Sequence, residues 1–126
     1  PNPTPGLTIT PGDAKLGLTT SNWGGLQLAD VCLPADALLG QPGKGFDIAR
    51  AVLGGGRIGI AAISLGLADR CMDCWLAHCS DNPVWQDRLA HWHTQLAAAT
   101  ALVDHAVASR HSDQATLTAS YAKAMA

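Results

Sequence analysis

Residues 15–68 read KLGLTTSNWGGLQLADVCLPADALLGQPGKGFDIARAVLGGGRIGIAAISLGLA, and they join two different kinds of sequence. The first half holds short alternating apolar positions, such as Leu26 and Leu28, between Gly-Gly and hydroxyl-rich turns, which is typical of short strands. From Phe46 to about Cys79 the sequence lacks proline and is rich in Ala, Ile and Leu, which favours one long helix. The sequence therefore predicts a mainly α-helical chain with a short β segment before the helices.

The division of the chain follows from the same contrast. Residues 1–34 carry five of the seven prolines, and Leu7 and Ile9 alternate as in a strand. Residues 35–45 are rich in glycine and proline, which bend the chain, so we interpret them as a linker. Residues 46–126 are then the helical part of the chain.

Two further helices are expected after the long one. In the first, apolar residues recur at alternating steps of four and three, which places them on one face. The second has Ser112 or Asp113 as its N-cap and runs to Ala126. Together with the long helix they predict an up-and-down bundle. The apolar face of the first consists of Trp85, Leu89, Trp92, Leu96, Ala99, Val103 and Ala106.

Composition argues against several classes of partner. The net charge is −2 and only 14% of residues are charged, so the chain has no basic surface for nucleic acid. The longest apolar run, Ile58 to Ala68, is shorter than the roughly 20 residues of a membrane span, so no membrane contact is expected. All ten acidic residues are Asp. A mechanism that needs a glutamate base must take it from outside these 126 residues.

Several motifs in the chain resemble the acyl-CoA dehydrogenase family. T-P-G-L-T-I lies near the N-terminus, and K-L-G-x-x-x-S-x-x-x-x-L-x-x-x-D-x-x-x-P begins at Lys15. L-G-x-x-G-x-G-F follows from Leu39, and G-R-I-G-I-A from Gly56 resembles the short-chain branch. The resemblance implies that residues 1–34 are the C-terminal part of the family's middle β-domain. It also implies that residues 46–126 are the first helices of its C-terminal helical bundle.

The resemblance implies an acyl-CoA site on the long helix. Three consecutive glycines, each costing roughly 1 kcal/mol against Ala in a helix, need a reason. In the family, the matching turn and the Arg of G-R-I bound the thioester end of the substrate. The alternative is that the glycines allow tight helix packing and that the arginine pairs with a carboxylate. The implied substrate-binding residues are Leu53, Gly54, Gly55, Gly56 and Arg57.

The identity of residue 56 bears on the catalytic base. In the isovaleryl and long-chain branches of the family, the catalytic Glu occupies the position before this Arg, whereas here the position is Gly56. The chemistry needs a carboxylate that removes the α-proton of the thioester while the β-hydrogen leaves as hydride to a flavin. The resemblance therefore implies a base on a later helix, beyond residue 126, and assigns no catalytic residue to this chain.

The expected flavin contacts depart from the family pattern. These enzymes usually carry R-x-x-F-G, whose Arg reaches the FAD diphosphate, and a Gln further along. Counted without gaps, Asn82 falls on that Arg, Trp85 on the Phe and His93 on the Gln. Asparagine lacks the charge and the fork that suit a phosphate. The chain is interpreted either as a subunit that binds FAD weakly through these three residues or as a flavin-poor partner subunit of a heteromeric enzyme. A third alternative is that the alignment shifts here and the family pattern is not met.

Clusters of cysteine and hydroxyl residues have plainer explanations. Cys71, Cys74 and His78 share a helix face, and their thiol and imidazole groups are of the kind that binds zinc. Even with Cys79 the chain lacks a second pair of ligands at the spacing of a zinc finger, so no metal is expected. Four cysteines are too few for a disulfide scaffold, which favours a reducing cytoplasm. Residues 19–22 form a turn that faces the active site in relatives, and turn propensity alone also explains them.

The function that the resemblance implies is α,β-desaturation of an acyl-CoA thioester by an FAD-dependent dehydrogenase. Electrons would pass to an electron-transfer flavoprotein, and the helical bundle would supply contacts for a homo- or hetero-oligomer. A flavin oxidase or monooxygenase of the same fold, such as an acyl-CoA oxidase, is the alternative. Oxygen consumption would separate the dehydrogenase from the oxidase.

Overall fold

The structure is a computed structural model that describes residues 4–79 and 82–126. The chain divides into two compact units, one ending at Pro42 and one spanning Gly43–Ala126. The second unit therefore begins within the stretch that the sequence marks as a linker. The assignment of residues 1–34 to a β-domain stays a prediction.

A β-hairpin forms most of the first unit. β1 (Leu7–Pro11) pairs antiparallel with β2 (Gly24–Leu28), so that Leu7 lies opposite Leu28 and Pro11 opposite Gly24. Both strands were expected from their alternating apolar residues, and both are confirmed. Their side chains are largely exposed, because two strands alone cannot cover each other.

Hydrogen bonds stabilise the turn between the two strands, and a short helical turn follows β2. In the turn between the strands, the Lys15 ammonium donates hydrogen bonds to the carbonyl oxygens of Leu18 and Ser21. The indole nitrogen of Trp23 donates to the carbonyl oxygen of Asp13 at 3.0 Å. After β2, the chain makes one turn of 3-10 helix, η1 (Ala35–Ala37), which the linker interpretation did not predict.

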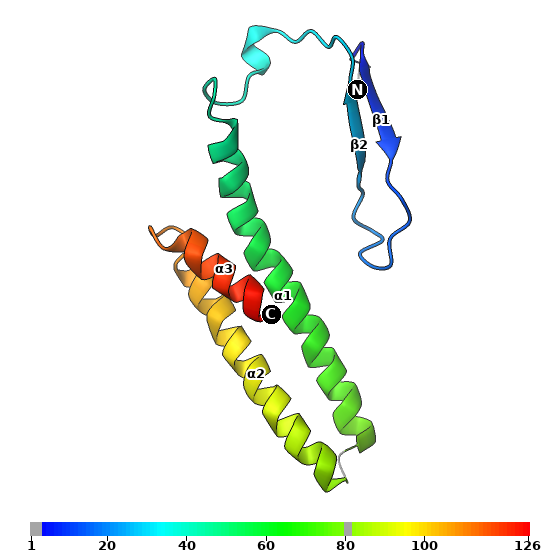
Figure 1. Ribbon diagram of the computed structural model, residues 1–126, viewed down its shortest axis with the longest axis vertical. Coiled ribbons are helices and arrows are strands. Elements are labelled where there is room, and N and C mark those ends of the chain that lie inside the picture. The colour runs from blue at the N-terminus through cyan, green and yellow to red at the C-terminus, as the bar shows by residue number, and fades with distance from the viewer. Residues whose placement is uncertain (1–3, 80–81) are drawn as a thin grey trace. The chain divides into compact units, whose positions relative to one another are not determined.

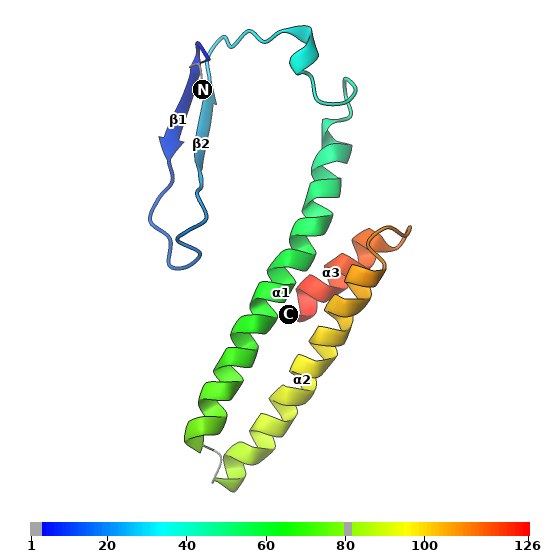
Figure 2. The ribbon, with the colours of Figure 1, turned by 180° about the vertical axis from the view of Figure 1, so that it is seen from behind.

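Three helices form the second unit, and each of them contacts the other two. α1 (Gly45–Cys79) and α2 (Pro83–Ala108) run antiparallel, and α3 (Ala115–Met125) packs against both, as Figures 1 and 2 show from opposite sides. Proline at the start of α2 suits a first helical turn, where its missing N–H would have no partner. The predicted mainly helical fold with a two-stranded sheet is confirmed.

The core of the helical unit is built from small side chains. Ala61 of α1, Val103 and Ala106 of α2, and Ala122 of α3 are buried against one another. Alanine at three of these four positions allows the three helix backbones to approach closely. Larger side chains, Ile58 and Leu65 among them, pack around this centre.

The face predicted for α2 is the face that packs. Leu89, Ala99, Val103 and Ala106 are buried, while Trp85, Trp92 and Leu96 are half-buried. This confirms the heptad-like spacing read from the sequence.

The N-cap predicted for the third helix was wrong by one or two residues. The residue before α3 is Gln114, and no side chain caps the helix. Ser112 lies in the preceding turn, where its hydroxyl accepts a hydrogen bond from the backbone N–H of Gln114 at 3.2 Å. The turn thus uses the hydroxyl that was expected at the helix start.

The length of α1 corrects the argument against a membrane span. Among the described residues, Gly45–His78 is long and apolar enough to cross a membrane by length and composition, and little of its most apolar stretch is buried. The run Ile58–Ala68 is shorter than the apolar part of this helix. Residues 51–68 contain a single charged residue, Arg57, so the apolar sequence extends on both sides of it. A charged residue inside a span costs about 2.5 to 3.5 kcal/mol on insertion scales. The absence of membrane contact stays a prediction.

Candidate functional site

Three glycines on α1 are not required by the chain's own structure. A Cβ atom added at Gly54, Gly55 or Gly56 would meet no atom of the described residues within 4 Å, apart from the adjoining helix backbone. None of the three has a positive φ, so the backbone conformation does not demand glycine either. The alternative that these glycines permit tight helix packing therefore finds no support within the described part of the chain.

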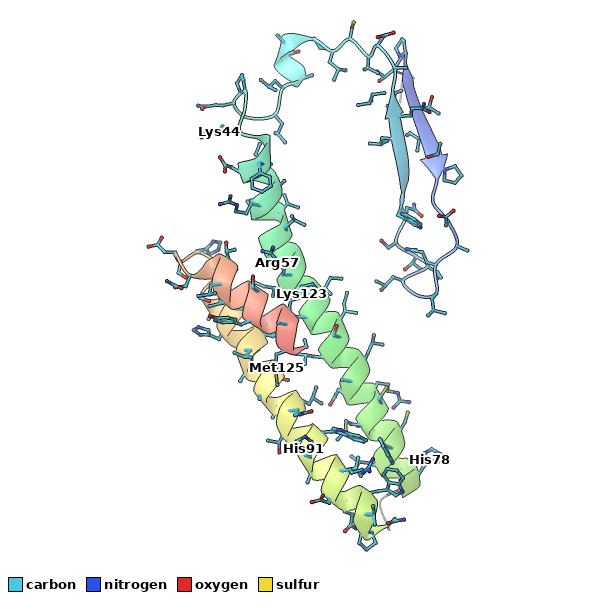
Figure 3. All side chains as sticks on the ribbon, viewed as in Figure 1. Lys44, Arg57, His78, His91, Lys123 and Met125 are labelled. Atoms are coloured by element: carbon cyan, nitrogen blue, oxygen red, sulfur yellow. The ribbon has the colours of Figure 1, made fainter. Side chains whose placement is uncertain are left out.

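Arg57 follows the glycines and has an unsatisfied polar atom. Its Nη1 is buried and has no hydrogen-bond partner among the described residues. The ion pairs of the described chain are Lys44 with Asp47 and Arg70 with Asp73, and neither includes Arg57. Figure 3 labels Arg57 on α1 and Lys123 on α3, the short helix that packs against α1. A buried donor without an acceptor costs about 1 to 3 kcal/mol, so an acceptor from another molecule or segment would stabilise this arrangement.

The surroundings of these residues are open. Leu53 is 58% exposed, and Gly55 and Gly56 are also exposed. Gly54 and Gly55 line a surface pocket of about 460 Å³ between α1 and the turn that joins α2 to α3. The structure therefore leaves Leu53, Gly55 and Gly56 exposed, whereas Gly54 and Arg57 are half-buried.

Asn82 has a structural role that the sequence analysis missed. Its Oδ1 accepts a hydrogen bond from the backbone N–H of Val84 at 3.0 Å, so Asn82 is the N-cap of α2. The signal was present in the sequence, because Asn followed by Pro is a common helix start. A cap occupies one polar atom of the side chain and leaves its amide NH₂ group for another partner.

Trp85 and His93, the other predicted cofactor residues, lie in different environments. Trp85 is half-buried, with its ring centroid 5.1 Å from that of Trp75, and the Arg88 guanidinium lies 5.3 Å from its ring centre. His93 is exposed and lies eleven positions after Asn82, which is about three helical turns, so the two share a face of α2. The structure thus places Asn82 and His93 along one side of the helix.

A cluster of three tryptophans joins the C-terminal end of α1 to the N-terminal part of α2. The ring centroids of Trp75 and Trp92 are 4.4 Å apart, and Trp85 completes the group. The α2 periodicity predicted that Trp85 and Trp92 face a neighbour. The pairing with Trp75 of α1 was not predicted, since periodicity within one helix does not identify its partner.

The cysteine-rich end of α1 brings no metal ligands together among the described residues. No group of three or more His, Cys, Asp or Glu side chains there is arranged to hold a metal ion. The Nδ1 of His78 is hydrogen-bonded to the carbonyl oxygen of Cys74 at 2.7 Å, which is a helical i to i−4 contact.

Comparison with known proteins identifies the class. A model of the acyl-CoA dehydrogenase C-terminal domain matches residues 43–126, so the chain belongs to the acyl-CoA dehydrogenase family. The match begins at the same residue as the helical unit of the structure. The predicted family resemblance and the helical-domain fold are thereby confirmed.

Individual relatives support the same conclusion. The short-chain specific acyl-CoA dehydrogenase of Bos taurus mitochondria is 49% identical over 74 residues, covering 59% of this chain and 18% of the relative. The acryloyl-CoA reductase (NADH) of Anaerotignum propionicum is 34% identical over 113 residues, covering 82% of this chain and 29% of the relative.

A solved structure matches nearly the whole chain. Butyryl-CoA dehydrogenase from Megasphaera elsdenii superposes with a TM-score of 0.88 at 32% identity, covering 98% of this chain and 35% of that chain. The chain thus spans between 18% and 35% of the length of these relatives.

Proposed function

We propose that this chain is part of an FAD-dependent acyl-CoA dehydrogenase that introduces a double bond between Cα and Cβ of an acyl-CoA thioester. The family membership supports the reaction class. The observation that carries the proposal is the run Gly54 to Gly56 beside the unpartnered Nη1 of Arg57. Glycines that the chain's own packing does not need leave room for a ligand to approach the helix backbone.

The chain's residues would bind and orient the thioester rather than react with it. The bare backbone from Gly54 to Gly56 would let the thioester lie against α1, and Arg57 would supply a charged hydrogen-bond donor to an acceptor nearby. The chain has no Glu, and position 56 holds glycine, so the base that removes the α-proton would come from outside these 126 residues. We assign no catalytic residue to this chain.

The residues of α2 that would face a flavin offer hydrogen bonds, and none of them is the family's arginine. FAD, when bound, would supply the acceptor for the β-hydride. The face of α2 that carries Asn82 and His93 fits hydrogen bonding to such a group, through the amide NH₂ of the N-cap and an exposed imidazole. It does not fit charge neutralisation of a diphosphate, because Asn82 stands where the family has Arg. Most flavin contacts would therefore come from elsewhere in the enzyme.

The test is the visible spectrum of the purified protein during anaerobic addition of acyl-CoA thioesters of increasing length. A yellow flavin band that bleaches on addition supports the proposal, and the chain length that bleaches fastest identifies the substrate class. A flavin band that no acyl-CoA bleaches would contradict it. Since one relative is named a reductase, the reverse reaction should be assayed with an enoyl-CoA and a reduced electron donor.

A second candidate function is a flavin-poor partner subunit in a heteromeric enzyme of the same family. The neutral side chain of Asn82, at the position where the family has Arg, favours this candidate, because it lacks the charge that suits the FAD diphosphate. A colourless protein that gains dehydrogenase activity only with a second subunit would support this candidate. An oxidase or monooxygenase of the same fold would instead consume oxygen during turnover.

The remaining partners belong to the same proposal. An electron-transfer flavoprotein would accept the electrons, and the helical unit would supply oligomer contacts, for which its exposed apolar residues such as Ile60, Ile63 and Leu67 provide surface. We place the protein in the cytoplasm, which agrees with the exposed, unpaired thiols of Cys32 and Cys71.

A further inference from the structure

The pocket beside the glycine run is lined by two arginines and a histidine and by no carboxylate. Arg50 from α1 and Arg110 and His111 from the turn after α2 all line the pocket of about 460 Å³. No Asp is among the residues that line it, and the two ion pairs of the described chain involve neither arginine. In a chain with only eight Lys and Arg residues and a net charge of −2, this grouping is not a consequence of composition.

Each arginine is exposed, makes one contact and keeps further N–H donors. The Arg50 guanidinium lies 5.2 Å from the ring centre of Phe46, one turn earlier on α1. The Nη1 of Arg110 donates to the carbonyl oxygen of Val107 at 2.9 Å, which closes the end of α2. A guanidinium has five N–H donors, so each arginine keeps several that face no acceptor in the described residues.

The start of α3 adds to this positive potential. Ala115 and Thr116, the first residues of α3, line the same pocket. No side chain caps this helix, and its first turn holds no acidic residue, so its positive dipole end is not neutralised there. The carboxylates that lie nearest along the chain, Asp47 on α1 and Asp113 before α3, are not among the lining residues, and Asp47 pairs with Lys44 instead.

We propose that this pocket binds a phosphate or diphosphate group, with Arg50 and Arg110 as its charged ligands and His111 as a further donor. Guanidinium groups match phosphate oxygens in geometry and charge, and a volume of this size admits the group together with part of the molecule that bears it. The phosphates belong either to the CoA part of the substrate proposed above or to a free phosphate ion.

The first experiment measures binding of inorganic pyrophosphate to the purified protein by calorimetry, without turnover. The native protein should bind it saturably, and added salt should weaken the binding. Arg110→Ser and Arg50→Ser should each weaken it by about tenfold, the equivalent of about 1.4 kcal/mol for one charged hydrogen-bond donor. Arg110→Lys should recover part of the loss, which excludes a merely structural role.

Arg70→Ser is the matched control, because it removes the same charge from α1 outside the pocket. Absence of saturable binding to the native protein would overturn the proposal. So would equal weakening by Arg70→Ser and Arg110→Ser, since that would show a general effect of charge. Circular dichroism of each variant establishes that the helices persist.

The second experiment separates the two sources of phosphate. If the pocket takes the phosphates of CoA, Arg110→Ser should raise KM for an acyl-CoA about tenfold and leave KM for the matching phosphate-free N-acetylcysteamine thioester unchanged. If it takes a free phosphate ion, both KM values should stay unchanged in Arg110→Ser, although pyrophosphate binding is weakened about tenfold. The calorimetric result does not depend on dehydrogenase activity, so failure of the proposed function leaves the anion site testable by itself.

Discussion

The side chain of Asn82 accepts a hydrogen bond from the backbone N–H of Val84, 3.0 Å away, and thereby begins α2. We expect Asn82→Ala to lower the free energy of unfolding by about 1 kcal/mol, because an N-cap is lost. Asn82→Ser should keep the native stability, since a serine hydroxyl can make the same bond. Urea denaturation of the three proteins checks this, and an unchanged midpoint for Asn82→Ala would contradict the capping role.

The charge missing at position 82 gives a separate prediction. Asn82→Arg should raise flavin affinity, because a guanidinium would then face the diphosphate that the neutral amide serves poorly. Flavin content after gel filtration and the dissociation constant of FAD measure the effect. Asn82→Gln is the control for side-chain length without charge. Full flavin occupancy of the native protein, unchanged in Asn82→Arg, would contradict the flavin-poor subunit.

Arg57 should contribute to function without contributing to stability. Because its buried Nη1 lacks a partner, Arg57→Met should leave the free energy of unfolding unchanged or raise it by up to about 1 kcal/mol. It should lower kcat/KM for the acyl-CoA. Arg70→Met, which removes an exposed arginine paired with Asp73, should change neither quantity appreciably. A loss of several kcal/mol of stability in Arg57→Met would show that the arginine has a structural partner instead.

The small residues of the core predict sensitivity to added volume. Ala106 is fully buried where the three helices meet, so Ala106→Leu should destabilise the protein by about 1 to 3 kcal/mol. Ala108→Leu, two residues later on the exposed side of α2, should be nearly neutral. Thermal denaturation followed by circular dichroism compares them. Equal melting temperatures for the two variants would mean that the alanine contact is not the core.

The glycine run predicts a gain of stability on substitution. Gly55→Ala should raise the free energy of unfolding by up to about 1 kcal/mol, because alanine is the better helix former and its methyl group has open space. Gly66→Ala, at an equally open helical position eleven residues later, should do the same. A destabilised Gly55→Ala protein would show that packing within the protein requires this glycine.

Much of the fold could be predicted because its signals are local. The alternation at Leu7 and Ile9 and the four-three spacing from Trp85 to Ala106 each belong to a single element. The missed features involve relations between elements or at their ends. The contact of Trp75 with Trp92 depends on how two helices meet, and the start of α3 at Ala115 depends on how Ser112 is used in the turn.

The candidate site was predictable only in part for the same reason. The run of three glycines before Arg57 is visible in the sequence as a cost that needs an explanation. Two other features depend on packing and cannot be predicted from residue spacing. A methyl group at Gly55 would meet open space, and Nη1 of Arg57 lacks an acceptor among the described residues. The grouping of Arg50 with Arg110 joins residues sixty positions apart, which only the folded bundle brings to one pocket.

The most direct test of the central claim compares the dissociation constants of a short acyl-CoA for Gly55→Ala and Gly66→Ala. If the thioester lies against the glycine run, the added methyl group in Gly55→Ala should weaken binding about tenfold, since forced overpacking costs about 1 to 3 kcal/mol. Gly66→Ala should bind like the native protein. Equal, native-like affinity in both variants would contradict the placement of the substrate on this part of α1.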